Sequence, residues 1–236
     1  MMEIKIAHGD KDIPAYMAKP EYDTGELVPG VVVVFDMLGM SHDVRHQTDW
    51  LGSEGYLAVA PDLYYEGRTR CIRNMVLDFA RGKGPTYDQM ESIRSWVASH
   101  PRCNGKVGII GFCLGGGFAL AFAANRGFSA AGANYGRLPR KYEELLKDAC
   151  PIVGSYGKKD PQLVGAAEKL EKVLAKNNIP HDIKEYPDAG HSFLNDHSEE
   201  SAIIRVGIKA LNLNYHEPSA IDARRRIVDF FNTHLN

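Results

Sequence analysis

The stretch Lys106–Asn125, KVGIIGFCLGGGFALAFAAN, decides the fold of this chain. Its first part, from Val107 to Ile110, is an apolar run bounded by glycine, which is typical of a strand buried on both faces. The part that follows Cys113 consists mainly of small residues and predicts a helix. Only a very tight turn fits between the two, so the stretch predicts a buried strand, a sharp reversal and a helix.

The turn itself fits the pattern G-x-nucleophile-x-G, with cysteine at the position where serine is commoner. Gly111 and Gly115 stand two positions before and after Cys113, where a Cβ atom would collide with the neighbouring backbone. Cys113 would then be accessible at the positive end of the following helix, an environment that favours a thiolate. We therefore interpret Cys113 as a candidate nucleophile.

Two other interpretations of the same stretch stay open at this point. A cysteine between phenylalanine and leucine is often a small buried hydrophobic residue. Glycines between a strand and a helix can also bind phosphate, but the chain has no G-x-x-x-x-G-K-[ST] motif and no complete G-x-G-x-x-G motif here. The rest of the chain has to decide between them.

Length and composition predict one soluble α/β domain over residues 1–236. A chain of 236 residues can build one sizeable core, and 44% hydrophobic with 25% charged residues is ordinary for a globular protein. The formal charge of −2 favours neither nucleic acid nor an anionic membrane as a partner. We expect a small-molecule ligand, no membrane association, and a monomer or small homo-oligomer.

The termini and the cysteines predict a cytoplasmic location. The first ten residues, MMEIKIAHGD, lack the basic and apolar regions of a signal peptide. The four cysteines show neither C-x-x-C spacing nor the framework of a secreted protein. No H-E-x-x-H motif is present, so we expect no metal and no cofactor.

Strands alternate with helices along nearly the whole chain. Expected strands cover Glu3–Ile6, Pro14–Lys19, Gly30–Phe35, Tyr56–Ala60, Val107–Ile110, Ser129–Tyr135, Pro151–Gly157 and His181–Tyr186. Expected helices run from a cap at Ser41 or Asp43 to about Ser53, and over Met75–Arg81, Thr86–His100, Arg140–Asp148, Leu163–Lys176 and Pro218–Leu235. This alternation predicts a mostly parallel sheet with helices on both faces, which places chemistry at the carboxyl ends of its strands.

His191 is the candidate base among nine histidines. It stands in the glycine-bearing loop PDAGHSF at 187–193, directly after an expected strand and downstream of Cys113, as the order nucleophile, acid, histidine requires. His42 and His46, at the start of a polar helix, can border the pocket. A structural loop histidine is the alternative for His191.

Asp160 is the candidate acid that orients this base. It follows the strand Pro151–Gly157 at its carboxyl end, whereas other acids in the interval lie on helical patterns with surface spacing. Asp188, three residues before His191, is the rival, although an Asx turn that shapes the loop explains it as well.

The strand Gly30–Phe35 should supply the rest of the site. The amide of Met37, just after this strand, and the amide of Leu114 are the candidate oxyanion hole. Asp36 can pair with Cys113 and hold it neutral, act as a local base, or simply form a turn.

Together these residues resemble the dienelactone hydrolase family, small α/β-hydrolases that use cysteine in place of serine. The resemblance extends over nearly the whole chain and rests on GFCLGG at 111–116, APDLY at 60–64, the aspartate in 157–161, GHSF at 190–193, and DAR with FF in the C-terminal helix. It implies an α/β-hydrolase fold without a large cap domain, with Cys113 as nucleophile, His191 as base and Asp160 as orienting acid. It also implies that Asp36 replaces the family's usual glutamate.

The resemblance leaves the substrate open. Family members that act on lactones bearing a carboxylate have an arginine shortly after the histidine, where this chain has Leu194-Asn195. A second family arginine can correspond to Arg70 or Arg73. We expect substrate contacts from five residues near the site, namely Arg70, Arg73, Tyr135, Phe193 and Asn195.

The predicted function is hydrolysis of a small ester or lactone, of the dienelactone or carboxymethylenebutenolide type, through an acyl-thioester on Cys113. Because a thiolate leaves a tetrahedral intermediate more easily than an amine, lactones, enol esters or thioesters are expected rather than peptides. Two alternatives are a peroxide-sensing thiol protein, for which neither Cys103 nor Cys150 has an evident route to Cys113, and a non-catalytic binder on a hydrolase scaffold.

Overall fold

A computed structural model of the chain describes residues 2–20, 25–210 and 213–236. Its centre is a single eight-stranded sheet with the order β1-β2-β4-β3-β5-β6-β7-β8. The first two strands are antiparallel, and all the others run parallel to one another. The strands are β1 (Met2–His8), β2 (Lys11–Ala18), β3 (Val28–Val34), β4 (Leu57–Pro61), β5 (Cys103–Phe112), β6 (Ala130–Asn134), β7 (Ile152–Gly157) and β8 (His181–Tyr186).

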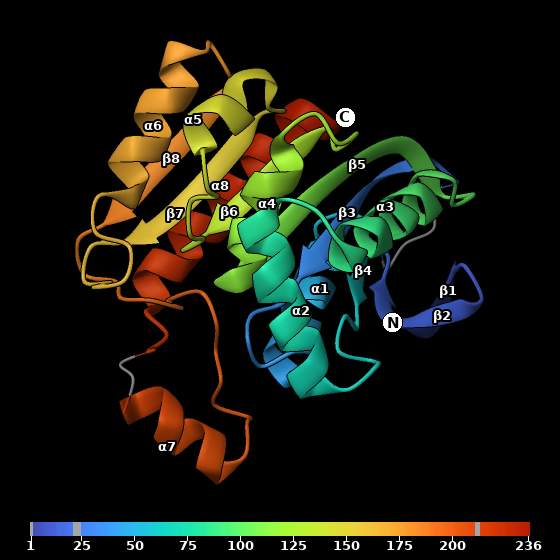
Figure 1. The fold of residues 1–236 in the computed structure, drawn as a ribbon, viewed down its shortest axis with the longest axis horizontal. Coiled ribbons are helices and arrows are strands. Elements are labelled where there is room, and N and C mark those ends of the chain that lie inside the picture. Colours follow the sequence, from blue (N-terminus) through green and yellow to red (C-terminus); the bar gives the residue numbers. More distant parts are fainter. Residues whose placement is uncertain (1, 21–24, 211–212) are drawn as a thin grey trace.

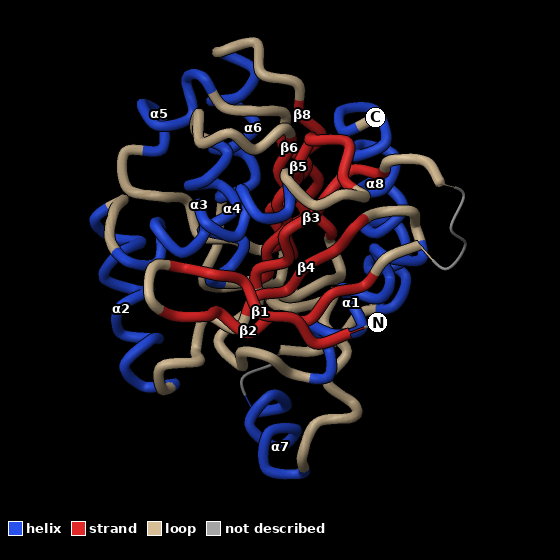
Figure 2. The backbone as a smooth tube through the Cα atoms, turned by 90° about the vertical axis from the view of Figure 1, so that its right-hand side faces the viewer, coloured by secondary structure: helices blue, strands red, loops and turns tan. Residues whose placement is uncertain are grey.

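Helices cover both faces of the sheet (Figure 1). Figure 2 shows α1 and α8 on one side of the strands and α2, α3, α4, α5 and α6 on the other. The helices are α1 (His42–Ser53), α2 (Arg68–Arg81), α3 (Pro85–Ala98), α4 (Leu114–Ala123), α5 (Tyr142–Leu145), α6 (Ala166–Lys176), α7 (Ala202–Ala210) and α8 (Glu217–Leu235). The architecture is that of an α/β-hydrolase, which confirms the predicted fold class.

The central strands are buried because their side chains are apolar on both faces. Val31 to Val34 of β3 are at most 1% exposed, and Ile109 and Ile110 of β5 are fully buried. Helix α8 presents Ala223, Ile227 and Phe231, spaced four residues apart, to the core from its side of the sheet. Burial of these apolar surfaces is the main favourable contribution to folding.

The helices differ from the prediction in several places. Helix α2 begins at Arg68, whereas the prediction began it at Met75. The expected helix Arg140–Asp148 is only the short α5 and one 3-10 turn, and α6 begins at Ala166 instead of Leu163. Helix α7 was not predicted, and it stands away from the sheet in both views (Figures 1 and 2). Ser41 caps α1, as expected, by accepting a hydrogen bond from the Val44 amide.

The strand order brings the ends of β3, β5, β7 and β8 to one edge of the sheet. The segment between β6 and β7 holds only α5 and one 3-10 turn, Leu146–Asp148, so this described segment forms no large cap over that edge. Within the described ranges, no helix combines the length and the apolar character that crossing a bilayer would require.

Candidate active site

Cys113 occupies a strained backbone position between β5 and α4. Its φ of 55° and ψ of −113° lie outside the regions that residues with side chains favour. A Cβ atom on Gly111 would lie 2.0 Å from the carbonyl oxygen of Gly115, and one on Gly115 would lie 2.2 Å from the carbonyl oxygen of Val34. The two glycines are therefore required by the reversal from strand to helix, for the reason the sequence suggested.

A third glycine lets the start of α4 approach the end of β6. A Cβ atom on Gly116 would lie 2.5 Å from the Asn134 carbonyl oxygen and 2.9 Å from the Cα atom of Gly136. The amide of Cys113 donates a hydrogen bond to the same Asn134 carbonyl, at 3.1 Å. The position of the thiol is thus fixed by two neighbouring strands as well as by the turn.

His191 and Asp160 meet at the carboxyl ends of β7 and β8. The Nδ1 atom of His191 lies 2.5 Å from Oδ2 of Asp160, and Asp160 is 1% exposed. Gly157 makes this contact possible, because a Cβ atom there would lie 2.4 Å from the carbonyl oxygen of Gly190. The other carboxylate oxygen of Asp160 accepts the Gln162 amide at 2.8 Å, so both of its oxygens are held.

Asp160 and Cys113 both stabilise the protonated imidazole of His191. Its burial lowers the pKa, but hydrogen bonds with Asp160 and Cys113, together with their charges, outweigh this effect and raise the pKa of His191 to about 10. Because Nδ1 faces Asp160, Nε2 is the nitrogen left for Cys113. The ring of Tyr135 supports the imidazole with a centroid distance of 5.3 Å.

Asp188, the rival acid, points elsewhere. Its side chain is 69% exposed and forms an ion pair with Lys159 at 3.2 Å. The structure therefore brings Asp160, and not Asp188, to the ring of His191.

The two backbone amides predicted as an oxyanion hole stay candidates. Within the described residues, the amides of Leu114 and Met37 donate no hydrogen bond. Arg68 fixes the peptide after Met37 by donating to its carbonyl oxygen at 3.1 Å. Gly39, with a φ of +80°, keeps the same turn close to Tyr64, whose ring carbon would lie 2.7 Å from a Cβ atom.

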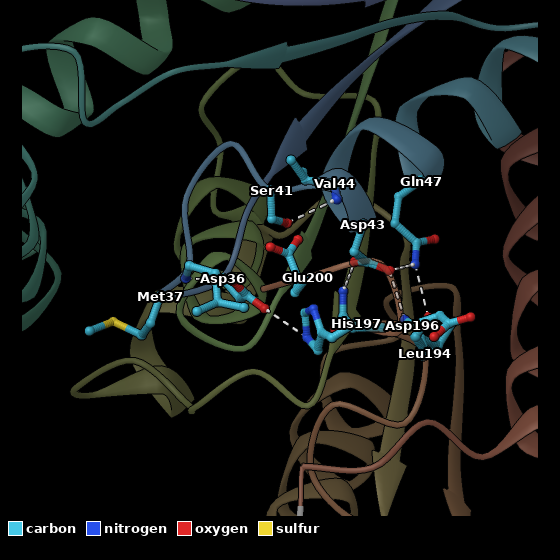
Figure 3. A network of polar contacts seen from close by, with 12 residues as sticks. Asp36, Met37, Ser41, Asp43, Val44, Gln47, Leu194, Asp196, His197 and Glu200 are labelled. Carbon is cyan, nitrogen blue, oxygen red and sulfur yellow. Dashed lines mark hydrogen bonds and ion pairs between the residues drawn. The ribbon is translucent and has the colours of Figure 1, made fainter. Parts of the chain in front are cut away.

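Asp36 turns out to be paired with a second histidine. One of its carboxylate oxygens accepts the Leu38 amide at 2.7 Å, and the other lies 3.7 Å from Nε2 of His197 (Figure 3). Burial raises the pKa of Asp36, although the Leu38 amide and His197 oppose the shift. The structure thus shows both a turn-forming bond and an ion pair for this carboxylate.

A second buried carboxylate, Asp43, holds the histidine loop from the side of α1. It accepts hydrogen bonds from the Asp196 amide at 2.8 Å, from the Gln47 side chain at 3.3 Å and from the Asn195 side chain. Figure 3 shows Asp43 reaching from α1 toward the loop that carries Asp196 and His197. Burial is the largest influence and raises the pKa of Asp43 to about 6.

The five predicted substrate contacts fall into two groups. Arg70 and Arg73 are exposed on the first turns of α2. Tyr135, Phe193 and Asn195 are at most 3% exposed and contact one another: the Tyr135 hydroxyl donates to Asn195, and its ring packs against Phe193. These three support the histidine loop, and direct contact with a substrate stays a prediction for all five.

Sequence reasoning missed His197 and the role of Asp43. His197 lies six positions after His191 in a loop with no recognised motif. Asp43 was considered only as a helix cap, whereas Ser41 takes that place. Both roles depend on the contact between α1 and the loop that follows His191, and no local sequence pattern predicts that contact.

Two further features bear on where a ligand could bind: clusters of metal-binding side chains, and a cavity away from Cys113. Within the described part of the chain, no cluster of three or more histidine, cysteine or acidic side chains is arranged to hold a metal ion. A cavity of about 860 Å³ lies at the far end of α4, where Arg126 and Lys141 are among its lining residues. None of the candidate residues lines it.

Comparison with known proteins gives a consistent result. The family model described as "Dienelactone hydrolase family" matches residues 13–235. A Yersinia pestis protein provisionally named carboxymethylenebutenolidase is 31% identical, and the match covers 98% of this chain and 88% of that protein. A provisionally named carboxymethylenebutenolidase of Escherichia coli K12 is also 31% identical, over 95% of this chain and 83% of that protein.

Solved structures share the fold. The crystal structure of a provisionally assigned dienelactone hydrolase from Klebsiella pneumoniae superposes with a TM-score of 0.81 at 27% identity, covering 99% of this chain and 98% of that one. A dienelactone hydrolase-like promiscuous phosphotriesterase from metagenomic libraries has a TM-score of 0.80 at 18% identity, covering 100% of this chain and 98% of that one, and is similar in fold.

Proposed function

This chain belongs to the dienelactone hydrolase family, and from that premise we propose that it hydrolyses small esters or lactones through an acyl-thioester on Cys113. The observation that carries the proposal is the contact of Nδ1 of His191 with Asp160, which leaves Nε2 for Cys113, the other electrostatic neighbour of the ring. We further propose that residues 1–236 act as one domain, since a single sheet takes strands from Met2 to Tyr186.

The first half of the reaction transfers the acyl group to sulfur. The thiolate of Cys113 attacks the carbonyl carbon, and the carbonyl oxygen becomes an oxyanion that the amides of Leu114 and Met37 stabilise. The bond from carbon to the leaving oxygen then breaks. The leaving alkoxide or enolate takes the proton from Nε2 of His191, and the acyl group remains on Cys113.

The second half returns the enzyme to its resting state. His191, now neutral, removes a proton from a water molecule that attacks the thioester carbon. The carbon–sulfur bond breaks, and Cys113 leaves as a thiolate beside the protonated ring. Asp160 keeps Nδ1 protonated throughout, so Nε2 is always the nitrogen that exchanges the proton.

The nucleophile limits the substrates. A thiolate is expelled from a tetrahedral intermediate more easily than an amine, so an amide substrate would revert to its starting state. Lactones, enol esters and thioesters have leaving groups that compete with the thiolate. We therefore propose these activated acyl compounds, including butenolide lactones of the kind named for the relatives, as substrates.

The charge around the site favours substrates without a strongly acidic group. Leu194-Asn195 stands where family members that bind acidic lactones have an arginine, and the Asn195 side chain already bonds Tyr135 and Asp43. Asp36 and Asp43 are buried carboxylates beside the same loop. A carboxylate on the substrate would have to approach them, so we propose a neutral lactone or ester.

The placement of the other cysteines gives little support to a peroxide-sensing protein. Cys150 donates its amide to the Ala123 carbonyl at the far end of α4, about 15 Å along the helix from its start. Cys103 begins the ten-residue strand that ends just before Cys113, about 30 Å away. Neither can form a disulfide with Cys113 without unfolding its element.

The test measures turnover of p-nitrophenyl acetate and of a simple neutral enol lactone. We expect Cys113→Ala and His191→Ala each to abolish turnover of both compounds. Cys150→Ala and His46→Ala are matched controls and should retain it, because Cys150 lies at the far end of α4 and His46, expected to border the pocket, is an exposed residue of α1 that pairs with Glu199. Turnover that survives Cys113→Ala would refute the proposal. Modification of the protein by peroxide without any ester or lactone turnover would favour the redox alternative.

A further inference from the structure

His197 lies buried between two carboxylates, next to the loop that would hold the oxyanion. It is 7% exposed, and its Nε2 atom is 3.7 Å from Oδ2 of Asp36 (Figure 3). Its ring is also an electrostatic neighbour of Asp43, the carboxylate that holds the same loop from α1. Nothing in the proposed chemistry uses this histidine, so its burial calls for a separate reason.

The geometry assigns the proton of the imidazole. Nε2 faces a carboxylate oxygen and must carry a hydrogen for the contact to be attractive. Nδ1 is buried and has no hydrogen-bond partner within the described part of the chain. Asp36 is therefore the acceptor that the His197 ring faces, and the contact can orient the Asp36 carboxylate.

Asp36 has its oxygens occupied by these neighbours. One accepts the Leu38 amide at 2.7 Å, and the other faces His197. Among the described residues, no hydrogen bond joins Asp36 to Cys113, although Asp36 follows β3 at the edge where Cys113 lies. The carboxylate is thus turned toward the histidine loop.

We propose that His197 is a positioning residue that holds Asp36 away from Cys113, so that the resting thiol is paired with His191. The inference rests on the proposed function, because it concerns the state of the proposed nucleophile. Without His197, Asp36 would be a buried carboxylate lacking its partner. It would then be free to turn toward Cys113, because the two residues follow the paired positions Val34 and Gly111 on the adjacent strands β3 and β5. A thiol bonded to Asp36 would stay neutral and react slowly.

The anchoring of the loop explains how this restraint is maintained. The Asp196 amide, next to His197 in the chain, donates to Asp43 at 2.8 Å, and the Asn195 side chain donates to the same carboxylate. The Gln47 side chain binds the Leu194 carbonyl at 2.9 Å. His191 and His197 are therefore carried by one loop that α1 fixes at three consecutive residues.

The experiment measures the rate at which iodoacetamide alkylates Cys113 between pH 5 and pH 10, which reports the thiolate without requiring a substrate. The variants are His197→Leu, His197→Gln, and His197→Leu combined with Asp36→Asn. In glutamine, the side-chain amide can replace Nε2–H as the donor to Asp36. His46→Leu is the control, since that exposed histidine of α1 pairs with Glu199 and not with Asp36.

In His197→Leu we expect the midpoint of the alkylation profile to rise by about one pH unit or more, which slows alkylation about tenfold near pH 6. His197→Gln should retain most of the wild-type profile, and Asp36→Asn should restore it in the leucine background. A role in folding alone would not be reversed by a change at Asp36. The control His46→Leu should match the wild type.

Two results would overturn the inference. One is a His197→Leu profile that coincides with the wild type, and the other is a shift that Asp36→Asn does not reverse. Either leaves the proposed function intact if turnover still depends on Cys113. Failure of the proposed function gives a different result, namely a wild-type protein whose Cys113 titrates as an ordinary thiol and supports no turnover.

Discussion

His191 and Asp160 are 31 positions apart in the chain, yet Nδ1 of the histidine lies 2.5 Å from Oδ2 of the aspartate. Two adjacent parallel strands, β7 and β8, end at the same edge and deliver the two side chains. The close approach of Gly157 to the Gly190 carbonyl lets the loops after these strands touch. The contact fixes the tautomer of His191, on which the proposed proton transfers depend.

Asp160→Asn should reduce kcat by a factor on the order of 10³ to 10⁴, because an asparagine can stabilise the wrong tautomer and cannot balance the imidazolium. The measurement is steady-state hydrolysis of p-nitrophenyl acetate. Asp188→Asn serves as the matched control, since its carboxylate is exposed and, among the residues that the structure describes, bound only to Lys159. Equal losses in the two variants would contradict the assignment of the acid.

The stability of the fold should depend on pH through His191. Its pKa in the folded protein is about 10, above the ordinary value of about 6.5 in an unfolded chain, so folding stabilises the protonated ring. This stabilisation is complete below about pH 6.5 and is lost as the pH rises through about 10. The melting temperature of the wild type should therefore fall more steeply over this window than that of Asp160→Asn, and parallel curves would refute the account.

Gly111→Ala should destabilise the fold by about 3 kcal/mol or more, because the new methyl group would overlap backbone atoms that cannot move aside. Urea unfolding measures the free-energy change. Gly207→Ala in α7 is the control, since a Cβ atom there meets nothing within 4 Å. A Gly111→Ala protein as stable as the control would mean that the turn at Cys113 is looser than the structure shows.

The features predicted correctly were those with local causes. The reversal at Cys113 could be recognised because Gly111 and Gly115 are required within five residues of one another. The contact between Asp160 and His191 followed from the rule that parallel strands deliver their carboxyl ends to one edge, whereas their catalytic roles stay a prediction. The candidate residues were thus found from short motifs and strand order.

The features that were missed depend on contacts distant in sequence or on absent local signals. Asn195 meets Asp43 across 152 positions, and no motif near either residue indicates the pairing. Helix α2 begins after Gly67, which provides no side-chain cap, and its first turn is basic, against the usual preference. The start of that helix therefore carries no sequence signature.

Asn195→Ala should cost about 1–3 kcal/mol of stability, because the Tyr135 hydroxyl and the Oδ2 atom of Asp43 lose the partner that Asn195 provides. If Asn195 supports the loop, kcat should fall for neutral and acidic esters alike. The measurement is kcat and KM for a matched pair of p-nitrophenyl esters, one neutral and one carrying a carboxylate. A change confined to the KM of one ester would instead assign Asn195 to substrate binding.

The most direct test of the central claim is to trap the acyl-enzyme. The protein is mixed rapidly with p-nitrophenyl acetate and quenched in acid, and the modified peptide is located by mass spectrometry. The account predicts one acetyl group on Cys113, removable by hydroxylamine as expected for a thioester, and longer-lived when His191 is replaced by alanine. An acetyl group on another residue, or none on Cys113 while turnover proceeds, would contradict it.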